Sequence, residues 1–124
     1  MTNSDPTVVI VDDDEPVRRS LAFLLETAGF GVCAFASGEE FLGASAIGAH
    51  RVALLDVHLP GWDGFEVLIE IRRRSPKLPV IFMTGRPDAA IRERCTELGA
   101  APLLEKPIRH RELLDTIHRV AAAL

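Results

Sequence analysis

The sequence predicts an α/β fold: a doubly wound, five-stranded parallel sheet in a flavodoxin-like three-layer sandwich, with strand order 2-1-3-4-5. Short apolar runs alternate along the chain with longer segments whose apolar residues recur at helical spacing, which is typical of repeated β-α units. The apolar runs show no polar alternation, and this indicates strands that are buried on both faces. The chain has 124 residues, the size of one ordinary domain with its own core.

The first predicted strand covers residues 8–11, and a helix follows that is capped by Asp14 or a neighbour, with Pro16 in its first turn. The apolar residues of this helix recur at helical spacing as far as Gly29, which ends it. Residues 31–35 are the second predicted strand. Together these segments form the first β-α-β unit of the sheet.

The middle of the chain supplies two further helices and the third strand. Residues 37–40, Ser-Gly-Glu-Glu, have the pattern of a capping box that opens a short helix through Leu42. Residues 52–55 are the third, uniformly apolar strand. A turn-rich loop at residues 60–64 leads into a helix that ends at Arg74, in a run of three arginines that we expect to be solvated.

The last third of the chain repeats the alternation twice. Residues 80–83 are the fourth strand, and a helix from about residue 88 to residue 98 ends at Gly99. Residues 103–104 are a short fifth strand. A closing helix covers residues 109–123 and completes the sandwich.

The composition argues against several classes of function. The formal net charge of −4 disfavours nucleic-acid binding by this segment. Cys33 and Cys95 match no zinc or redox spacing, so we expect two reduced, buried thiols. No apolar run reaches the ~18 residues of a membrane span, and the first residues do not form a signal peptide. We therefore expect a cytoplasmic protein.

Polar side chains follow the predicted strands at the points where the strands end. The acidic run at residues 12–14 follows the first strand, Asp56 the third, Thr84 the fourth, and the pair at residues 105–106 the fifth. Because the carboxyl ends of parallel strands lie along one edge of a sheet, these groups should converge where open α/β sheets bind ligands.

Carboxylates that meet in one small site repel one another unless a cation neutralises them. No histidine or cysteine cluster accompanies these acids, so the cation should be a hard one, Mg²⁺ or else Mn²⁺. Asp12 and Asp13 are predicted metal ligands, and Asp56 is predicted to be both a ligand and the nucleophile that forms an aspartyl phosphate. Thr84 and Lys106 would bind the phosphoryl oxygens through a hydroxyl and an ammonium group.

Other interpretations of these residues are possible. The acidic run could serve only to cap the next helix, although one acid suffices for that and Asp14 is the one expected to do it. A flavin or nucleotide carrier of the same fold would need a glycine-rich phosphate loop in place of the acidic run. A Mg²⁺-dependent phosphohydrolase would need a general acid beside Asp56, where the sequence offers only His58, and a substrate-selecting cap.

Four motifs resemble those of bacterial two-component response-regulator receiver domains. They are residues 8–13 (Val-Val-Ile-Val-Asp-Asp), residues 55–64, residues 83–85 (Met-Thr-Gly) and residues 105–107 (Glu-Lys-Pro). The four motifs occur in the same order as in the family and span nearly the whole chain. The sequence most resembles receivers of transcription factors with a C-terminal helix-turn-helix domain. The resemblance implies one receiver domain, residues 1–124, either alone or as the N-terminal part of a longer regulator.

By this resemblance, Asp56 is the phosphoacceptor, and a sensor histidine kinase supplies the phosphoryl group in a Mg²⁺-dependent reaction. Asp12 and Asp13 hold the metal with Asp56 and the backbone carbonyl of His58, and Thr84 moves on activation. The resemblance implies a phosphoacceptor signalling domain rather than an enzyme, although the domain takes part in its own phosphoryl transfer and hydrolysis. The alternative is a receiver-like module that binds partners without phosphorylation.

One position departs from the pattern of the family. Receivers commonly carry an aromatic residue in the fifth strand that turns when the threonine moves, and here that place is Leu103. We therefore expect the loop at residues 85–87 and the following helix to carry the switch. That helix, the fifth strand and the closing helix would form the output or homodimer face. Receivers of similar sequence also use a cis bond between Lys106 and Pro107.

Overall fold

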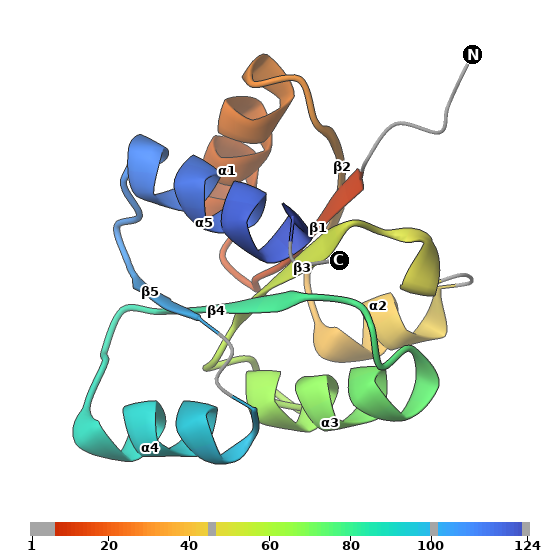
Figure 1. Ribbon diagram of the computed structural model, residues 1–124, viewed down its shortest axis with the longest axis vertical. Helices are drawn as coiled ribbons and strands as arrows, with labels where there is room; N and C mark the ends of the chain where they lie inside the picture. Colours follow the sequence, from red (N-terminus) through yellow and green to blue (C-terminus); the bar gives the residue numbers. More distant parts are fainter. Residues whose placement is uncertain (1–6, 45–46, 100–101, 123–124) are drawn as a thin grey trace.

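The structure is a computed structural model that describes residues 7–44, 47–99 and 102–122. Its strands form one sheet of order β2-β1-β3-β4-β5 in which every neighbouring pair is parallel (Figure 1). The strands are β1 (Thr7–Val11), β2 (Gly31–Phe35), β3 (Val52–Asp56), β4 (Val80–Thr84) and β5 (Leu103–Glu105). The helices are α1 (Glu15–Thr27), α2 (Gly38–Gly43), α3 (Gly64–Arg74), α4 (Ala89–Glu97) and α5 (His110–Ala122), with a short 3-10 turn, η1 (Ile47–Ala49), before β3. The predicted fold class and strand order are confirmed.

The sheet lies between two layers of helices, with α1 and α5 on one face and α2, α3 and α4 on the other (Figure 1). Side chains alternate between the two layers along each strand. In β1, Val8 and Ile10 join the core beneath α1 and α5, while Val9 and Val11 join the core beneath α2, α3 and α4. This two-sided burial explains why the inner strands read as unbroken apolar runs.

The predicted elements agree with the structure to within one or two residues at their ends. Asp14 caps α1 as expected, and Gly29 and Gly99 follow their helices with φ of 100° and 105°, the left-handed conformation that glycine tolerates. Cys95 is buried, but Cys33 is only partly buried, and both thiols are free. In the described ranges, no helix is both long and apolar enough for a membrane crossing.

The capping box expected at the start of α2 is only half formed. Ser37 Oγ accepts a hydrogen bond from the Glu40 amide at 3.1 Å, but Glu40 Oε1 accepts from the amide of Ala36 instead of that of Ser37. The complete capping box lies at the start of α3, where Asp63 and Glu66 each accept from the other's backbone amide at 2.9 Å. This box fixes the point at which the loop after β3 turns into α3.

The arginines that end α3 are not simply solvated, as the sequence had suggested. Arg72 Nη1 donates to the carbonyl oxygen of Leu98, at the end of α4, at 2.7 Å. Arg74 Nη1 donates to the carbonyl oxygen of Leu42, in the last turn of α2, at 2.7 Å. Both arginines therefore satisfy carbonyl groups that a helix end leaves without an intrahelical partner, and they tie α3 to its two neighbours.

The loop between β3 and α3 folds back tightly against the end of β3. The Gly64 amide donates to the carbonyl oxygen of Val57 at 3.0 Å. A Cβ atom at Gly64 would lie 2.5 Å from the backbone oxygen of Asp56 and 3.0 Å from Val57 Cα. Only a residue without a side chain allows this approach, which sets the position of the chain that follows Asp56.

We predict that Gly64→Ala lowers the free energy of unfolding by about 1–3 kcal/mol, because backbone atoms must shift to admit the methyl group. Gly43→Ala is the matched control, since a Cβ atom there meets no atom within 4 Å. The control should raise the stability by up to about 1 kcal/mol, because alanine is the better helix former. Urea unfolding of both variants tests this, and equal effects would contradict the close approach at Gly64.

Candidate metal and phosphoryl site

Four strands deliver polar groups to one edge of the sheet. Asp12 directly follows β1, Asp56 ends β3, Thr84 ends β4, and Lys106 directly follows β5. Backbone hydrogen bonds carry the register of the sheet into this edge, because the Lys106 amide donates to the Thr84 carbonyl at 2.8 Å. The convergence that the sequence predicted is thus present.

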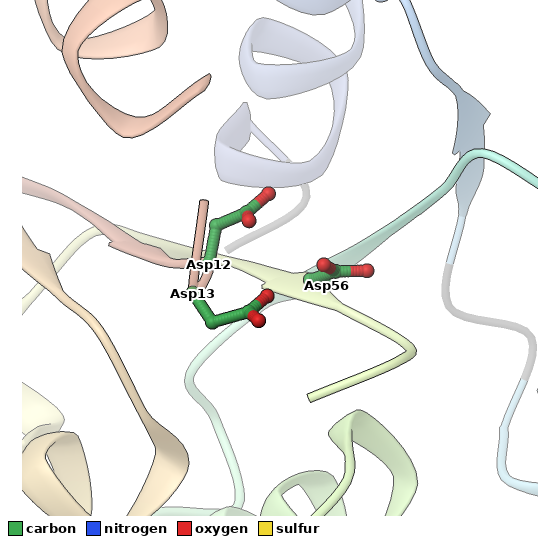
Figure 2. Close-up of side chains that lie close together, drawn as sticks. All are labelled: Asp12, Asp13 and Asp56. Atoms are coloured by element: carbon green, nitrogen blue, oxygen red, sulfur yellow. The ribbon is translucent and has the colours of Figure 1, made fainter. Parts of the chain in front are cut away.

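Three carboxylates meet at this edge, two from the end of β1 and one from the end of β3 (Figure 2). One oxygen from each of Asp12, Asp13 and Asp56 can be chosen so that all three lie within 4.8 Å of one another. Asp12 is fully buried and Asp56 is 6% exposed, whereas Asp13 is exposed. The cluster therefore has two inner acids and one acid at the solvent side.

Asp12 is held on several sides. Its amide donates to the carbonyl oxygen of Phe35 at 3.1 Å, which ties it to the neighbouring strand β2. Its Oδ1 atom accepts from the Asp14 amide at 2.9 Å, and its Oδ2 atom accepts from Lys106 Nζ at 2.7 Å. These hydrogen bonds and the ion pair with Lys106 compensate for the burial of the Asp12 carboxylate.

Lys106 places a positive charge among the acids. Its Nζ atom lies 2.7 Å from Asp12 Oδ2 and 3.1 Å from Asp56 Oδ2. Burial by itself would lower the pKa of Lys106, but the hydrogen bond to Asp12 and the charges of Asp56 and Asp12 outweigh burial and raise this pKa. The ammonium group is therefore charged at neutral pH and neutralises part of the acidic cluster.

The ionised form of Asp56 is disfavoured by its surroundings. Burial is the largest effect on its pKa and the charge of Asp12 adds to it, so the pKa of Asp56 is raised. Lys106 and the His58 amide, which donates to Asp56 Oδ1 at 3.1 Å, act in the opposite direction but do not cancel the rise. The carboxylate of Asp56 would gain from any further positive charge placed beside it.

Thr84 is fully buried, and its hydroxyl contacts the loop that follows β4. Thr84 Oγ1 accepts a hydrogen bond from the Arg86 amide at 3.0 Å. A hydroxyl can donate as well as accept, so Thr84 can hold this loop and still offer a proton toward the edge of the sheet. Thr84 is thereby linked to the segment that leads into α4.

Two predicted switch residues lie outside the acidic cluster. Leu103 pairs in register with Phe82 and packs, half-buried, against the core on the α2, α3 and α4 side. Pro107 follows a cis peptide bond with Lys106, as predicted, and its side chain is exposed. The His58 side chain is exposed, and His58 contacts Asp56 through its backbone amide.

An open pocket of about 470 Å³ adjoins the solvent side of the cluster. Asp13, from the loop after β1, lines it together with residues of the loop after β3, of α3 and of α4: Val57, His58, Leu59, Pro60, Asp63, Phe65 and Ile91. The sequence did not reveal Phe65 and Ile91 as neighbours of the acids, because only the packing of α3 and α4 brings them there. The pocket provides room for a group larger than a metal ion beside Asp13.

The donor set at this edge suits a hard cation. The candidate ligands are carboxylate oxygens, and no sulfur or imidazole ligand belongs to the group found among the described residues. Mg²⁺ and Mn²⁺ prefer such oxygen ligands and accept a few carboxylates together with water or phosphate oxygens. A cation beside Asp56 would also supply the positive charge that this buried carboxylate lacks.

Fold and site together define a parallel α/β domain with an acidic edge, at the carboxyl ends of its strands, that could hold a cation. The family described as response regulator receiver domain matches residues 8–118, and the chain belongs to this family of two-component signalling proteins. Domains of this family are phosphorylated by histidine kinases and generally bind Mg²⁺ at an acidic pocket, the kind of pocket that Asp12, Asp13 and Asp56 form here.

Relatives of known name are similar over most of this chain. The transcriptional regulatory protein FixJ of Azorhizobium caulinodans is 42% identical over 110 residues, which are 89% of this chain and 52% of FixJ. Nodulation protein W of Bradyrhizobium diazoefficiens is 38% identical over 110 residues, again 89% of this chain and 48% of the relative. The chain thus spans about half the length of these curated relatives.

Solved structures agree with the fold. A response regulator receiver domain protein from Clostridium thermocellum has a TM-score of 0.88 at 25% identity and is matched over 95% of both chains. The BeF3-activated receiver domain of DrrB has a TM-score of 0.86 at 29% identity, with 95% of this chain and 98% of that chain covered.

We predict that Asp56→Asn raises the melting temperature of the metal-free protein at neutral pH by a few degrees. The raised pKa of Asp56 means that its ionised form costs stability in the folded state. This cost is fully present above the folded pKa and disappears as the pH falls below the unfolded value of 3.8. The gain from Asp56→Asn should therefore vanish in acid.

Asp115→Asn is the control for this measurement, because it removes the same charge from an exposed position on α5. Thermal melts in chelator at neutral and acidic pH compare the two variants with the parent. If Asp56→Asn gains no more than Asp115→Asn at neutral pH, the buried charge of Asp56 is not the source of instability.

Proposed function

We propose that this domain accepts a phosphoryl group on Asp56 from the phosphohistidine of a sensor histidine kinase, in a reaction that requires Mg²⁺ or Mn²⁺. The observation that carries the proposal is the position of Asp56: it ends β3 beside Asp12 and Asp13 and within 3.1 Å of Lys106 Nζ. A carboxylate can act as nucleophile toward phosphorus when positive charge surrounds the phosphoryl oxygens. Lys106 supplies one positive charge at this position, and a cation held by Asp12 and Asp13 would supply the rest.

Each residue of the site has a defined task in this proposal. A carboxylate oxygen of Asp56 forms the new bond to phosphorus while the bond between phosphorus and the kinase's histidine nitrogen breaks. Asp12, Asp13 and the backbone carbonyl of His58 would hold the cation together with Asp56, and a cation there would supply positive charge for the phosphoryl oxygens. The ammonium group of Lys106 would move its hydrogen bond from a carboxylate oxygen to a phosphoryl oxygen, which its flexible side chain allows.

Thr84 couples this chemistry to a change of shape. A phosphoryl group on Asp56 offers strong acceptors for the Thr84 hydroxyl, and movement toward them would break the hydrogen bond from the Arg86 amide. The loop at residues 85–87 would then rearrange together with α4. Leu103 fills space against Phe82 in this scheme and does not report the switch as an aromatic ring would.

The output of the domain follows from the same coupling. The face built by α4, β5 and α5 would change most, and we assign to it a homodimer contact or the docking of a partner. Because relatives such as FixJ are transcriptional regulators about twice as long as this match, residues 1–124 would be the N-terminal receiver of such a regulator. Contact with DNA would then belong to another part of that protein.

The kinase reaction would take place in the cytoplasm, where a histidine kinase obtains its phosphoryl group from ATP. The domain would also hydrolyse its own aspartyl phosphate, but it would not turn over other phosphate esters. A receiver-like module that works without phosphorylation is the competing function, and labelling with a small phosphodonor separates the two.

Acetyl phosphate with Mg²⁺ should add one phosphoryl group to the chain, because nucleophile and phosphoryl-binding groups all belong to this domain. Asp56→Asn should abolish the added mass completely, while Asp115→Asn, a control at an exposed position, should leave it unchanged. Intact-mass spectrometry with Mg²⁺ or with chelator provides the measurement. A parent protein that stays unlabelled would favour the phosphorylation-independent module, and a labelled Asp56→Asn would place the nucleophile elsewhere.

Thr84→Ala should still be labelled on Asp56 but should lose the change of shape, because the side chain that links the phosphoryl group to the loop is missing. Amide hydrogen exchange with and without a beryllofluoride phosphoryl mimic measures this change over residues 85–98. Thr84→Ser keeps the hydroxyl and should behave like the parent. If the mimic alters exchange equally in the parent and in Thr84→Ala, another residue carries the coupling.

A further inference from the structure

Arg18 lies at the end of the first turn of α1, and its half-buried side chain reaches back to the acidic loop. Arg18 Nη1 donates to the carbonyl oxygen of Asp12 at 2.8 Å. The Asp12 amide is bonded to the carbonyl oxygen of Phe35 at 3.1 Å. The backbone of Asp12 is thus held on both sides, through β2 at its amide and through α1 at its carbonyl.

The carbonyl group of Asp12 belongs to the peptide unit that joins Asp12 to Asp13. A peptide unit is planar, so a bond that fixes its oxygen also fixes the direction in which the chain continues to Asp13. The Asp13 side chain is exposed, and its position relative to Asp12 and Asp56 therefore depends strongly on the backbone. Arg18 can in this way control how the carboxylates face one another.

We propose that Arg18 is a positioning residue of the cation site, which acts through the Asp12 carbonyl to set the place of the Asp13 carboxylate. The proposal rests on the proposed function, because it requires that Asp12, Asp13 and Asp56 bind a divalent cation. Groups that orient metal ligands from outside the ligand shell commonly change metal affinity by about 10- to 100-fold when they are lost. Arg18 does not itself touch the cation in this arrangement.

The charge of Arg18 and its hydrogen bond are expected to change the Mg²⁺ affinity in opposite directions. A guanidinium near the site repels a cation, so removal of its charge alone would tighten Mg²⁺ binding. Removal of its hydrogen bond would weaken Mg²⁺ binding, because the carboxylates lose their arrangement. The sign of the change in affinity therefore separates the two roles.

Arg19 provides the matched control. It is the next residue of α1, it carries the same charge, and its side chain is exposed. Mg²⁺ titration calorimetry on the unphosphorylated 124-residue chain should give Arg19→Ala an affinity equal to or slightly tighter than that of the parent. Arg18→Ala should bind Mg²⁺ about tenfold more weakly than the parent.

A melting curve in chelator accompanies each titration. A purely structural role of Arg18 would lower the melting temperature but leave the Mg²⁺ affinity of the folded protein at the parent value, and that result would overturn the proposal. Binding by Arg18→Ala as tight as that of Arg19→Ala would overturn it as well. If Arg18→Ala does not fold, Arg18→Met decides, because it keeps the apolar stem and its packing but removes the donor.

Failure of the metal site itself gives a different result. Asp13→Ala removes a proposed ligand and should bind Mg²⁺ much more weakly than the parent. If the parent binds no Mg²⁺, or if Asp13→Ala binds it as the parent does, the proposed cation site is wrong and the role of Arg18 falls with it. When the parent binds Mg²⁺ and Asp13→Ala binds it much more weakly, as expected, the proposed cation site holds. If Arg18→Ala and Arg18→Met then bind Mg²⁺ as tightly as Arg19→Ala, only the positioning role is overturned.

Discussion

The ammonium group of Lys106 is shared between two buried carboxylates, and the arrangement of the site depends on this contact. It joins residues 94 and 50 positions apart in the sequence, at 2.7 Å from Asp12 and 3.1 Å from Asp56. Without such a partner, two buried carboxylates would have to take up a proton or be hydrated by water that enters the site. The contact is possible because β1, β3 and β5 belong to one parallel sheet, so that the residues at their carboxyl ends lie along one edge.

Lys106 neutralises only part of the negative charge of the acidic cluster. The charge that remains favours binding of a cation at this site. The pKa of Asp56 stays raised although Lys106 lies beside it, because burial and the charge of Asp12 outweigh the attraction. One ammonium is thus divided between two acids, and the exposed Asp13 adds a third. The site tolerates its own charge at a cost, and a ligand that brings positive charge relieves this cost.

Much of the molecule could be predicted from the sequence because its signals are local. Uniformly apolar runs identified the strands, and the polar residue after each run identified the edge where Asp56, Thr84 and Lys106 meet. The partners that these side chains choose were not predictable in this way. Lys106 was expected to await a phosphoryl group, yet in the structure it binds Asp12 and Asp56, because an ammonium pairs with whatever acids lie within its reach.

The same limit applies to long arginine side chains. Arg18, Arg72 and Arg74 each donate to a backbone carbonyl, and carbonyl groups are present at every residue, so that composition cannot tell which one is chosen. Arg72 and Arg74 reach residues 26 and 32 positions away. Only the packing of the helices decides these contacts, and the residues that line the pocket beside Asp13 are decided in the same way.

The sheet also divides the interior into two cores that, among the described residues, have no buried side chain in common. Leu103 and Phe82 belong to the core beneath α2, α3 and α4, whereas Leu104 belongs to the core beneath α1 and α5. A substitution that alters side-chain volume on one side therefore acts first on the packing of that side. During evolution, the two faces of such a domain can therefore drift separately, so that new contacts arise on one face while those of the other are inherited intact.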